Sequence, residues 1–371
     1  MKAEPVTDDL TDRLRAATRA ASTGVFWHAP RSPAEVLAAL ATAAAELGIT
    51  EWDVYGDGGA VTRLEDEVAG LLGTDAAVFV PSGILAQQAA LRVWCDRRGS
   101  RRVALPDLSH LLRHEADGPR LLHGLEVEHL TTGREVATAA HLAKVPGRLG
   151  AALVELPLRD AGCLLPTLEE LRGLSTAAGQ RGVPLHLDAA RLWEAQPSYD
   201  VPLAELAGLA DSLYVSFYKG LGALPGAAVA GAADVVEEVR LWRKRMGGTL
   251  QRMTPQALSA LVALRDRLPH LAEELAWART FAAALAERGL RPHPSPPHTS
   301  VFEVYADRPA DEVNERLLAL VESTGVAVGP PWRAGDMPGT AVCEVSCYSQ
   351  VLEHDPARVA DWFAAVAAPV G

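Results

Sequence analysis

Cysteine is scarce in this sequence of 371 residues, and no run of apolar residues is long enough to cross a bilayer. None of its cysteines forms the C-x-x-C pair that is typical of zinc and redox sites. The four cysteines are Cys95, Cys163, Cys343 and Cys347. The first residues also lack the apolar core of a signal peptide. We therefore expect reduced thiols in a cytoplasmic protein, with no metal site and no membrane partner.

Positively charged residues are also fewer than negatively charged ones, with 35 lysines and arginines against 47 aspartates and glutamates. The formal net charge of −12 argues against nucleic acid as the main partner. Apolar residues make up 49% of the chain and charged residues 22%, the balance of an ordinary globular protein. The length exceeds what one hydrophobic core usually serves, so we expect two domains.

Strand-like and helix-like segments alternate through the middle of the chain, which predicts an α/β fold with a mostly parallel sheet. The predicted strands are residues 76–80, 102–105, 126–130, 151–156 and 212–217. A proline-rich stretch at residues 293–298, HPSPPH, indicates a domain boundary. We expect an N-terminal helical segment over residues 1–50, a large domain over residues 51–292 and a small α+β domain over residues 293–371.

Two charged residues end strand-like runs about one βαβ unit apart: Asp188 and Lys219. Ligands gather at the carboxyl ends of parallel strands, so both side chains can point into one crevice. The pair suits pyridoxal phosphate, because the lysine can bind it as a Schiff base while the carboxylate keeps its ring nitrogen protonated. Spacing alone leaves an alternative, in which Asp188 caps a helix and Lys219 is a solvated surface residue.

The residues around this pair resemble a known family. LHLDAARLWEA at 185–195 is similar to H-(I/M)-D-G-A-R-(I/L), and VSFYKGLGALPGAAVAG at 215–231 to F-x-x-S-K-G-L-x-A-P-x-G-(S/A). Both motifs belong to the threonine aldolase and β-eliminating lyase family, whose members are pyridoxal phosphate enzymes of fold type I, the aminotransferase-like architecture. The resemblance implies that Lys219 binds the cofactor, that Asp188 contacts the pyridine nitrogen and that Arg191 lies near the ring oxygen.

A strand–turn–helix at FVPSGILAQQ, residues 79–88, can bind a phosphate through the backbone amides of a helix N-terminus. It resembles the family's F-V-P-S-G-T-M-A-N-Q, which implies that Ser82, Gly83 and Ile84 contact the phosphate, although Ile84 lacks the family's hydroxyl. LPDLSHLLRHEADG, residues 105–118, resembles the segment whose histidine stacks on the cofactor ring, which implies this role for His110.

Further cofactor and partner contacts are implied less directly. Tyr218 stands just before the lysine and could cover the phosphate or narrow the substrate channel. The family's phosphate-binding arginine is either shifted by one position onto Arg252 or missing from this sequence. Tyr55 resembles the tyrosine of D-D-V-Y-G, which reaches the neighbouring subunit, so a homodimer or homotetramer is expected.

The substrate side departs from the family. Leu158 stands where the family's loop E-N-T-H-N has a histidine that contacts the substrate hydroxyl, and Cys343 where it has a carboxylate-binding arginine. We therefore expect weak activity on threonine. Candidate carboxylate partners are Arg31, Arg159 and Arg333. Candidate groups for an apolar substrate are Phe26 and Trp27, and His28 or His110 could act as the base.

The resemblance implies a pyridoxal phosphate-dependent lyase that cleaves or eliminates at Cβ of a β-hydroxy or β-substituted amino acid. Two alternatives stay open. One is decarboxylation or transamination of a larger, less polar substrate with the same cofactor. The other is a cofactor-binding protein without turnover, which a cofactor spectrum unchanged by every amino acid would favour.

Overall fold

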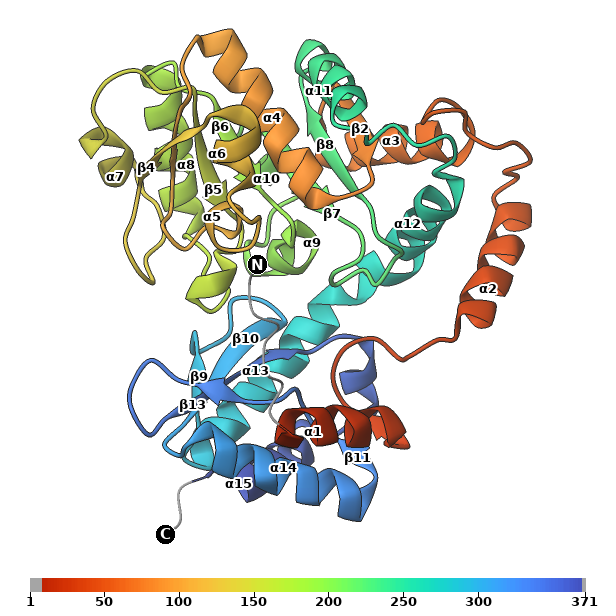
Figure 1. Ribbon diagram of the computed structural model, residues 1–371, viewed down its shortest axis with the longest axis vertical. Coiled ribbons are helices and arrows are strands. Elements are labelled where there is room, and N and C mark those ends of the chain that lie inside the picture. Colours follow the sequence, from red (N-terminus) through yellow and green to blue (C-terminus); the bar gives the residue numbers. More distant parts are fainter. Residues whose placement is uncertain (1–8, 369–371) are drawn as a thin grey trace. The chain divides into compact units, whose positions relative to one another are not determined.

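The computed structural model describes residues 9–368, and contacts divide the chain into two compact units (Figure 1). The large unit runs from Arg31 to His270, and the small unit combines the segment up to Pro30 with the chain from Leu271 onward. Both boundaries fall earlier than the expected residues 50 and 292. The reason is packing: the helix at residues 33–46 packs on α12 of the large unit, and the helix at residues 271–287 on α15 of the small unit.

The small unit contains a four-stranded antiparallel sheet in the order β12-β13-β10-β9 and a two-stranded parallel pair, β1 with β11. Its elements are α1 (Asp9–Ala20), β1 (Thr23–Gly24), α13 (Leu271–Glu287), β9 (Arg291–His293), β10 (Val301–Ala306), α14 (Ala310–Thr324), β11 (Val326–Ala327), β12 (Arg333–Ala334), β13 (Ala341–Ser346) and α15 (Pro356–Ala367). The proline-rich residues 293–298 therefore lie within this unit, at the end of β9 and before β10. Residues 1–8 of the expected N-terminal helical segment lie outside the described residues.

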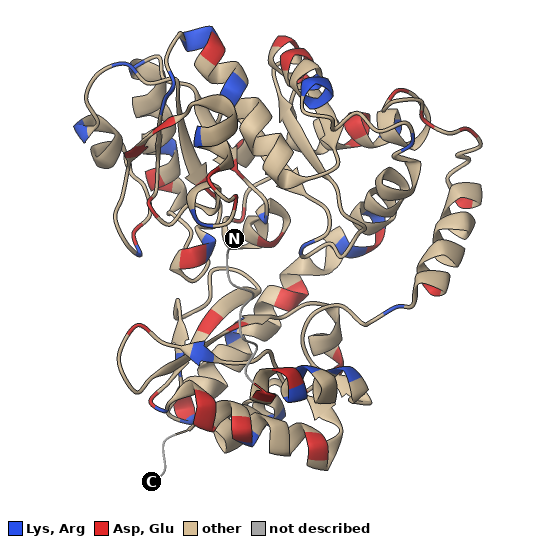
Figure 2. Cartoon of the chain, viewed as in Figure 1, with Lys and Arg blue, Asp and Glu red and all other residues tan. Residues whose placement is uncertain are grey.

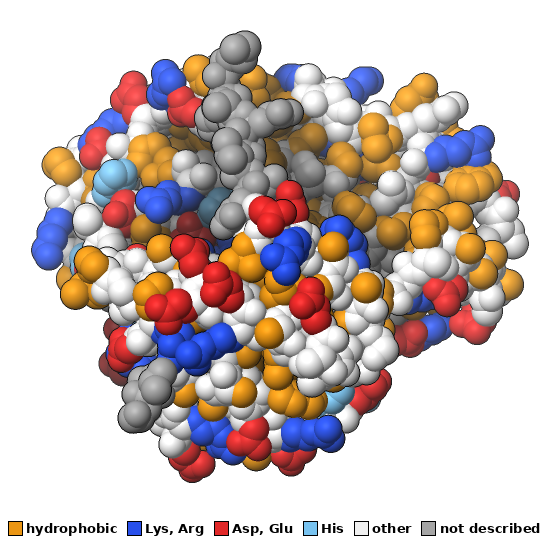
Figure 3. Space-filling view, turned by 60° about the horizontal axis from the view of Figure 1, so that its bottom comes forward, with side chains coloured by type: hydrophobic (Ala, Val, Ile, Leu, Met, Phe, Trp, Pro, Cys, Tyr) orange, Lys and Arg blue, Asp and Glu red, His pale blue; other side chains and the backbone are white. Residues whose placement is uncertain are grey.

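An aromatic cluster fills the core of the small unit. Phe26 packs against Phe281 and Phe363 with ring centroids 5.8 and 5.7 Å apart, and its side chain is fully buried. The expectation that Phe26 contacts substrate is therefore wrong, because the small unit uses this ring as core. Charged and apolar side chains are mixed on the face of the protein that Figure 3 turns forward.

The large unit is built on a seven-stranded sheet in the order β2-β8-β7-β6-β5-β3-β4. The five strands from β7 to β4 are parallel, and β8 pairs antiparallel with both β2 and β7. The strands are β2 (Ala76–Val80), β3 (Arg102–Leu105), β4 (Glu126–His129), β5 (Ala151–Glu155), β6 (Leu185–Asp188), β7 (Ser212–Ser216) and β8 (Ala227–Gly231). A mostly parallel α/β sheet, as the alternating pattern predicted, is confirmed.

The helices of this unit are α2 (Pro33–Glu46), α3 (Gly59–Leu72), α4 (Gly83–Arg98), α5 (His110–Arg113), α6 (Gly118–His123), α7 (Ala139–Lys144), α8 (Leu168–Gln180), α9 (Leu192–Ala195), α10 (Leu203–Ala207), α11 (Ala233–Arg245) and α12 (Thr254–Arg267). Alternate residues of the strands, among them Val78, Val103 and Val229, pack on α4 and α11 in one apolar cluster. Figure 2 shows acidic and basic residues interspersed on these helices. One ion pair joins Arg97 of α4 to Asp234 of α11 at 3.0 Å.

Strand β8 lacks a sequence signal, since AAVAG has little of the β-branched and aromatic content that marks strands. It is fully buried between β2 and β7 and is packed on by α3 and α4. Its small side chains allow the neighbouring helices to pack closely. The segment is therefore a strand because of its place in the sheet and not because of its own sequence preference.

Candidate active site

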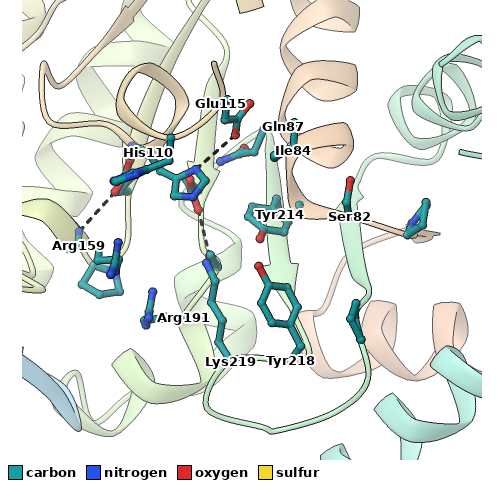
Figure 4. A pocket seen from close by; sticks show the side chains of 18 residues that line it. Ser82, Ile84, Gln87, His110, Glu115, Arg159, Arg191, Tyr214, Tyr218 and Lys219 are labelled. Atoms are coloured by element: carbon teal, nitrogen blue, oxygen red, sulfur yellow. Dashed lines mark hydrogen bonds and ion pairs between the residues drawn. The ribbon is translucent and has the colours of Figure 1, made fainter. Parts of the chain in front are cut away.

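The carboxyl ends of β5, β6 and β7 meet at one cavity of about 290 Å³ in the large unit (Figure 4). Strand register sets Glu155 at the end of β5 beside Asp188 at the end of β6, and Asp188 beside Tyr214 of β7. The chain then turns after β7, so that Lys219 also lines the cavity. The sheet thus brings together the carboxylate and the amine that the sequence singled out.

Burial governs the state of Lys219. The pKa of its ammonium falls to about 8, first because the group is removed from water and then because Arg191 repels it. Asp188 and Glu194 act in the opposite direction. An amine with this pKa is partly neutral near neutral pH, which is the form that attacks a carbonyl carbon.

A second acidic group, Glu155, lies beside Asp188 on the neighbouring strand. Burial, followed by repulsion from Asp188, raises the pKa of Glu155 to about 8. The Glu155 carboxylate accepts hydrogen bonds from the backbone N–H groups of His110 and, at 3.4 Å, Arg159. Asp188 accepts one from the backbone N–H of Ala190 at 3.2 Å. Glu155 therefore fixes two cavity segments by their backbone.

Helix α4 begins at the cavity wall. Ser82 is its N-cap, with an oxygen that accepts a hydrogen bond from the Leu85 N–H at 3.3 Å. Gly83 follows, and a Cβ atom there would lie 2.1 Å from the Tyr214 hydroxyl. Only glycine therefore fits between the helix start and the tyrosine. Ile84 lines the same cavity and is 44% exposed.

His110 starts the short helix α5 on another side of the cavity. Its Nδ1 lies 3.4 Å from the Glu115 carboxylate, which also accepts a hydrogen bond from Gln88 Nε2 at 2.8 Å. Burial raises the pKa of Glu115, while these two partners lower it. The ring of His110 is thus held by a buried acid, as Figure 4 shows.

A buried polar chain supports the cavity floor. The His186 ring lies 2.7 Å from Gln87 Oε1 and 2.7 Å from the Ser212 hydroxyl, which accepts a hydrogen bond from Trp94 Nε1 at 2.8 Å. Burial lowers the pKa of His186 to about 3, so the ring is neutral. Because the Gln87 oxygen is engaged below, its Nε2 is a donor on the cavity side, with no hydrogen-bond partner among the described residues.

Most of the expected cofactor residues lie together. Lining the cavity are Ser82, Gly83, Ile84, His110, Asp188, Arg191, Tyr218 and Lys219, and of the expected substrate residues Arg159. Arg252 does not line it, because its guanidinium lies over the Trp52 ring, 5.0 Å from the centroid. Tyr55 lines a different cavity, and Arg31 binds the Glu35 carbonyl at 3.1 Å.

Three expected substrate residues belong to the small unit. His28 stacks on Tyr348 with ring centroids 4.7 Å apart, and Trp27 donates its backbone N–H to the Ser346 carbonyl at 3.0 Å. Arg333 pairs with Glu303 at 2.6 Å, so its charge already has an acidic partner. Cys343 is fully buried, which agrees with its inability to bind a substrate carboxylate.

Sequence reasoning missed several lining residues, notably Glu155, Tyr214, Gln87 and His114. His114 comes four residues after His110 at the end of a short helix, so both rings project from one side. That spacing was the available signal. Glu155 could have been found as a second carboxylate at a strand end.

The residues of the cavity fit pyridoxal phosphate. Such a cofactor engages a buried lysine with a lowered pKa and a carboxylate at a strand end, and both are present. It also engages polar groups at a helix start, which here are the backbone at Gly83 and the Gln87 amide. Within residues 9–368, no cluster of three metal-binding side chains occurs. No helix in that range is long and apolar enough to span a membrane.

Comparisons with known proteins agree with this geometry. A β-eliminating lyase family profile matches residues 32–308. A probable low-specificity L-threonine aldolase 2 of Arabidopsis thaliana is 30% identical over 75% of this chain and 81% of its own length. A crystal structure of a candidate L-allo-threonine aldolase from Listeria monocytogenes covers 96% of this chain and 99% of its own, at 34% identity and a TM-score of 0.89.

A structure from Exiguobacterium, described as an aromatic amino acid β-eliminating lyase or threonine aldolase, is also 34% identical, with a TM-score of 0.88 over 95% of this chain and 99% of its own. The chain belongs to the β-eliminating lyase family. It is a threonine aldolase-like lyase with the fold type I architecture, and the family's cofactor is pyridoxal phosphate.

Proposed function

We propose that this protein cleaves the Cα–Cβ bond of a β-hydroxy-α-amino acid, giving glycine and an aldehyde. The observation that carries the proposal is the convergence of Asp188, Lys219 and His110 on one cavity in a chain of this family. In such a cleavage the β-hydroxyl loses its proton, its O–H electron pair becomes the carbonyl bond, and the Cα–Cβ pair remains on Cα. Pyridoxal phosphate, when bound, supplies the electron sink for that pair.

Four residues of the cavity have assigned roles in this proposal. Lys219 holds the cofactor covalently and afterwards returns a proton to Cα, which its pKa of about 8 allows near neutral pH. Asp188 keeps the proton on the pyridine nitrogen. The backbone N–H groups from Gly83 onward receive the phosphate, and His110 covers the ring.

Arg159 is the proposed partner of the substrate carboxylate. It lines the cavity, whereas Arg31 and Arg333 do not. Replacing Arg159 by alanine removes a charged hydrogen bond worth about 1.5–3 kcal/mol, so kcat/KM should fall roughly 10- to 150-fold, mainly through KM. Arg113, exposed on α5 and outside the cavity lining, provides the matched control R113A.

Threonine itself stays predicted to be a weak substrate. Leu158, where the family's loop has a histidine, is 2% exposed and offers no proton acceptor. Apolar groups on the cavity wall, Ile84, Pro157 and Tyr218, favour a larger β-substituent. We expect β-phenylserine to be cleaved faster than L-threonine or L-allo-threonine.

Product analysis tests the reaction. The purified protein, loaded with pyridoxal phosphate, is incubated with the three β-hydroxy amino acids, and products are identified by mass spectrometry. The proposal expects equal amounts of glycine and aldehyde. Carbon dioxide or a keto acid, without aldehyde, would instead support decarboxylation or transamination.

We also propose a homodimer or homotetramer in which Tyr55 meets the neighbouring subunit. Trp52, Val54 and Tyr55 are 54%, 60% and 57% exposed, an apolar group that a second copy would cover. Light scattering of the wild type and of V54D tests this, since an unchanged mass for V54D argues against it. A cytoplasmic location stays a prediction.

A further inference from the structure

A buried leucine, Leu158, occupies the position at which the family has a hydroxyl-binding histidine. Leu158 is buried at the base of a small loop that runs from Leu158 to Leu164. The loop is closed by two backbone hydrogen bonds between these residues, of 2.8 and 3.2 Å. We call residues 158–164 the substrate loop. Cleavage of a β-hydroxy amino acid still requires a proton acceptor, so another group must supply it.

His114 is placed to fill this role. It follows helix α5, lines the cavity, and its ring centroid lies 5.0 Å from that of His110. Its side chain is 41% exposed, so a substrate can reach it. Unlike His110, whose Nδ1 contacts Glu115, His114 has its acidic partner on the substrate loop.

That partner is Asp160. Its two carboxylate oxygens lie 2.8 and 3.1 Å from His114 Nε2. A carboxylate only accepts hydrogen bonds, so Nε2 carries the proton in the neutral ring and Nδ1 keeps the lone pair. Within the described part of the chain, no hydrogen bond to this Nδ1 is found.

The substrate loop carries both the proposed carboxylate partner and the acid that contacts His114. Arg159 lies 3.5 Å from Asp160, so the proposed carboxylate partner and the acid behind His114 are adjacent. The titratable groups that contact His114 are Asp160 from the loop and His110 from its own segment. One step further away, Arg159 contacts Asp160 and Glu115 contacts His110. His114 and Arg159 thus line the same cavity, and Asp160 contacts both of them.

We propose that His114 Nδ1 accepts the proton of the substrate's β-hydroxyl, with Asp160 as its positioning residue. This rests on the proposed function. The O–H bond breaks toward oxygen, that electron pair forms the aldehyde C=O bond, and the Cα–Cβ pair stays on Cα, where the bound cofactor stabilises it. The proton on His114 is released to solvent after the aldehyde leaves, and Cα is protonated to give glycine.

The experiment compares two reactions of one active site. Cleavage of β-phenylserine needs a base at the β-hydroxyl, whereas exchange of the glycine α-proton in D₂O, followed by ¹H NMR, does not. H114A should lower kcat for cleavage by about 10²–10⁴-fold and leave the exchange rate unchanged. H129A, at an exposed histidine ending β4, should change neither rate.

Two more readouts separate chemistry from structure. Added imidazole should restore part of the cleavage rate of H114A, because the site is open to solvent. In the cofactor-free protein with ¹⁵N-labelled histidine, the His114 signal should show the proton on Nε2, and D160N should change that tautomer. D160N should also lose part of the cleavage rate while keeping exchange.

The outcomes are distinct. If H114A cleaves at the wild-type rate, or loses exchange together with cleavage, the role of His114 is overturned while the proposed function stands. If the wild type exchanges the glycine proton but cleaves no β-hydroxy amino acid, the proposed function fails and takes the role of His114 with it.

Discussion

The two sides of the cavity are built in different ways. The cofactor side consists of Gly83 at the start of α4, Asp188 at the end of β6 and Lys219 after β7. The substrate side consists of the substrate loop and His114, which come from irregular segments. The first side is fixed by the register of a buried sheet, whereas the second depends on local contacts such as that between Asp160 and His114.

This difference teaches which residues can change independently. Moving Asp188 means moving a strand with both neighbours hydrogen-bonded to it, so its position is held by the entire sheet. The substrate loop is held by fewer contacts, namely its closing hydrogen bonds, the bond from the Arg159 N–H to Glu155 and the contact of Asp160 with His114. Cofactor chemistry can therefore persist while substrate contacts are replaced, as the loss of the family's loop histidine indicates.

The largest effect is expected for Lys219 on the cofactor side. K219A removes the only amine that lines the cavity within the described residues, so covalent attachment of the cofactor and cleavage should both be lost. Borohydride treatment followed by mass spectrometry of peptides measures attachment. K144A, at an exposed lysine in α7, is the control. Cofactor still trapped on K219A would show that the attachment site is elsewhere.

Asp188 is expected to have the next largest effect. D188N should bind the cofactor but lower kcat by a factor on the order of 10²–10³, because an amide does not stabilise a charged pyridinium in a buried site. Cofactor affinity by fluorescence and kcat by product formation are measured separately. Near-wild-type kcat would reduce Asp188 to a cap that accepts the Ala190 N–H.

Gly83 provides a steric test of the same side. G83A drives a methyl group into the Tyr214 hydroxyl, so either the helix start or the tyrosine must shift, at about 1–3 kcal/mol of overpacking. The loss should appear as weaker cofactor binding by calorimetry. G173A is the matched control, because a Cβ there meets no atom within 4 Å. Equal cofactor affinity in both variants would contradict the tight fit.

The smallest effect on turnover, and one visible mainly in stability, concerns His186. Its folded pKa of about 3 lies below the ordinary value near 6.5, so between these values only the unfolded chain takes up the proton. This contribution to stability is complete above pH 6.5 and falls by about 1.4 kcal/mol per pH unit below it. Unfolding free energies in urea from pH 6.5 to pH 4.5 should decline less steeply for H186N. Equal slopes would mean that the ring is charged in the folded protein.

The sequence was informative where chain order and strand ends determine position. Asp188 and Lys219 could be predicted because each follows an apolar run. Strand β8 and the pairing of His114 with Asp160 could not, since one depends on burial of small residues and the other on contact between segments far apart in sequence. Arg252 was placed by motif spacing, and its stacking on Trp52 is a tertiary contact that spacing does not encode.

The closed form of the substrate loop has a consequence for engineering. Because Leu158 and Leu164 bond to each other and residues 161–163 are buried between them, the two partly exposed positions Arg159 and Asp160 can be replaced as a cassette, with both ends anchored as before. A library confined to that cassette would sample new substrate preferences on an unchanged cofactor platform. Buried Leu158 would remain unchanged at one end of the loop in every variant. New substrate specificities can thus be sought in a short segment of the chain, while the residues at the ends of the sheet strands keep the cofactor side unchanged.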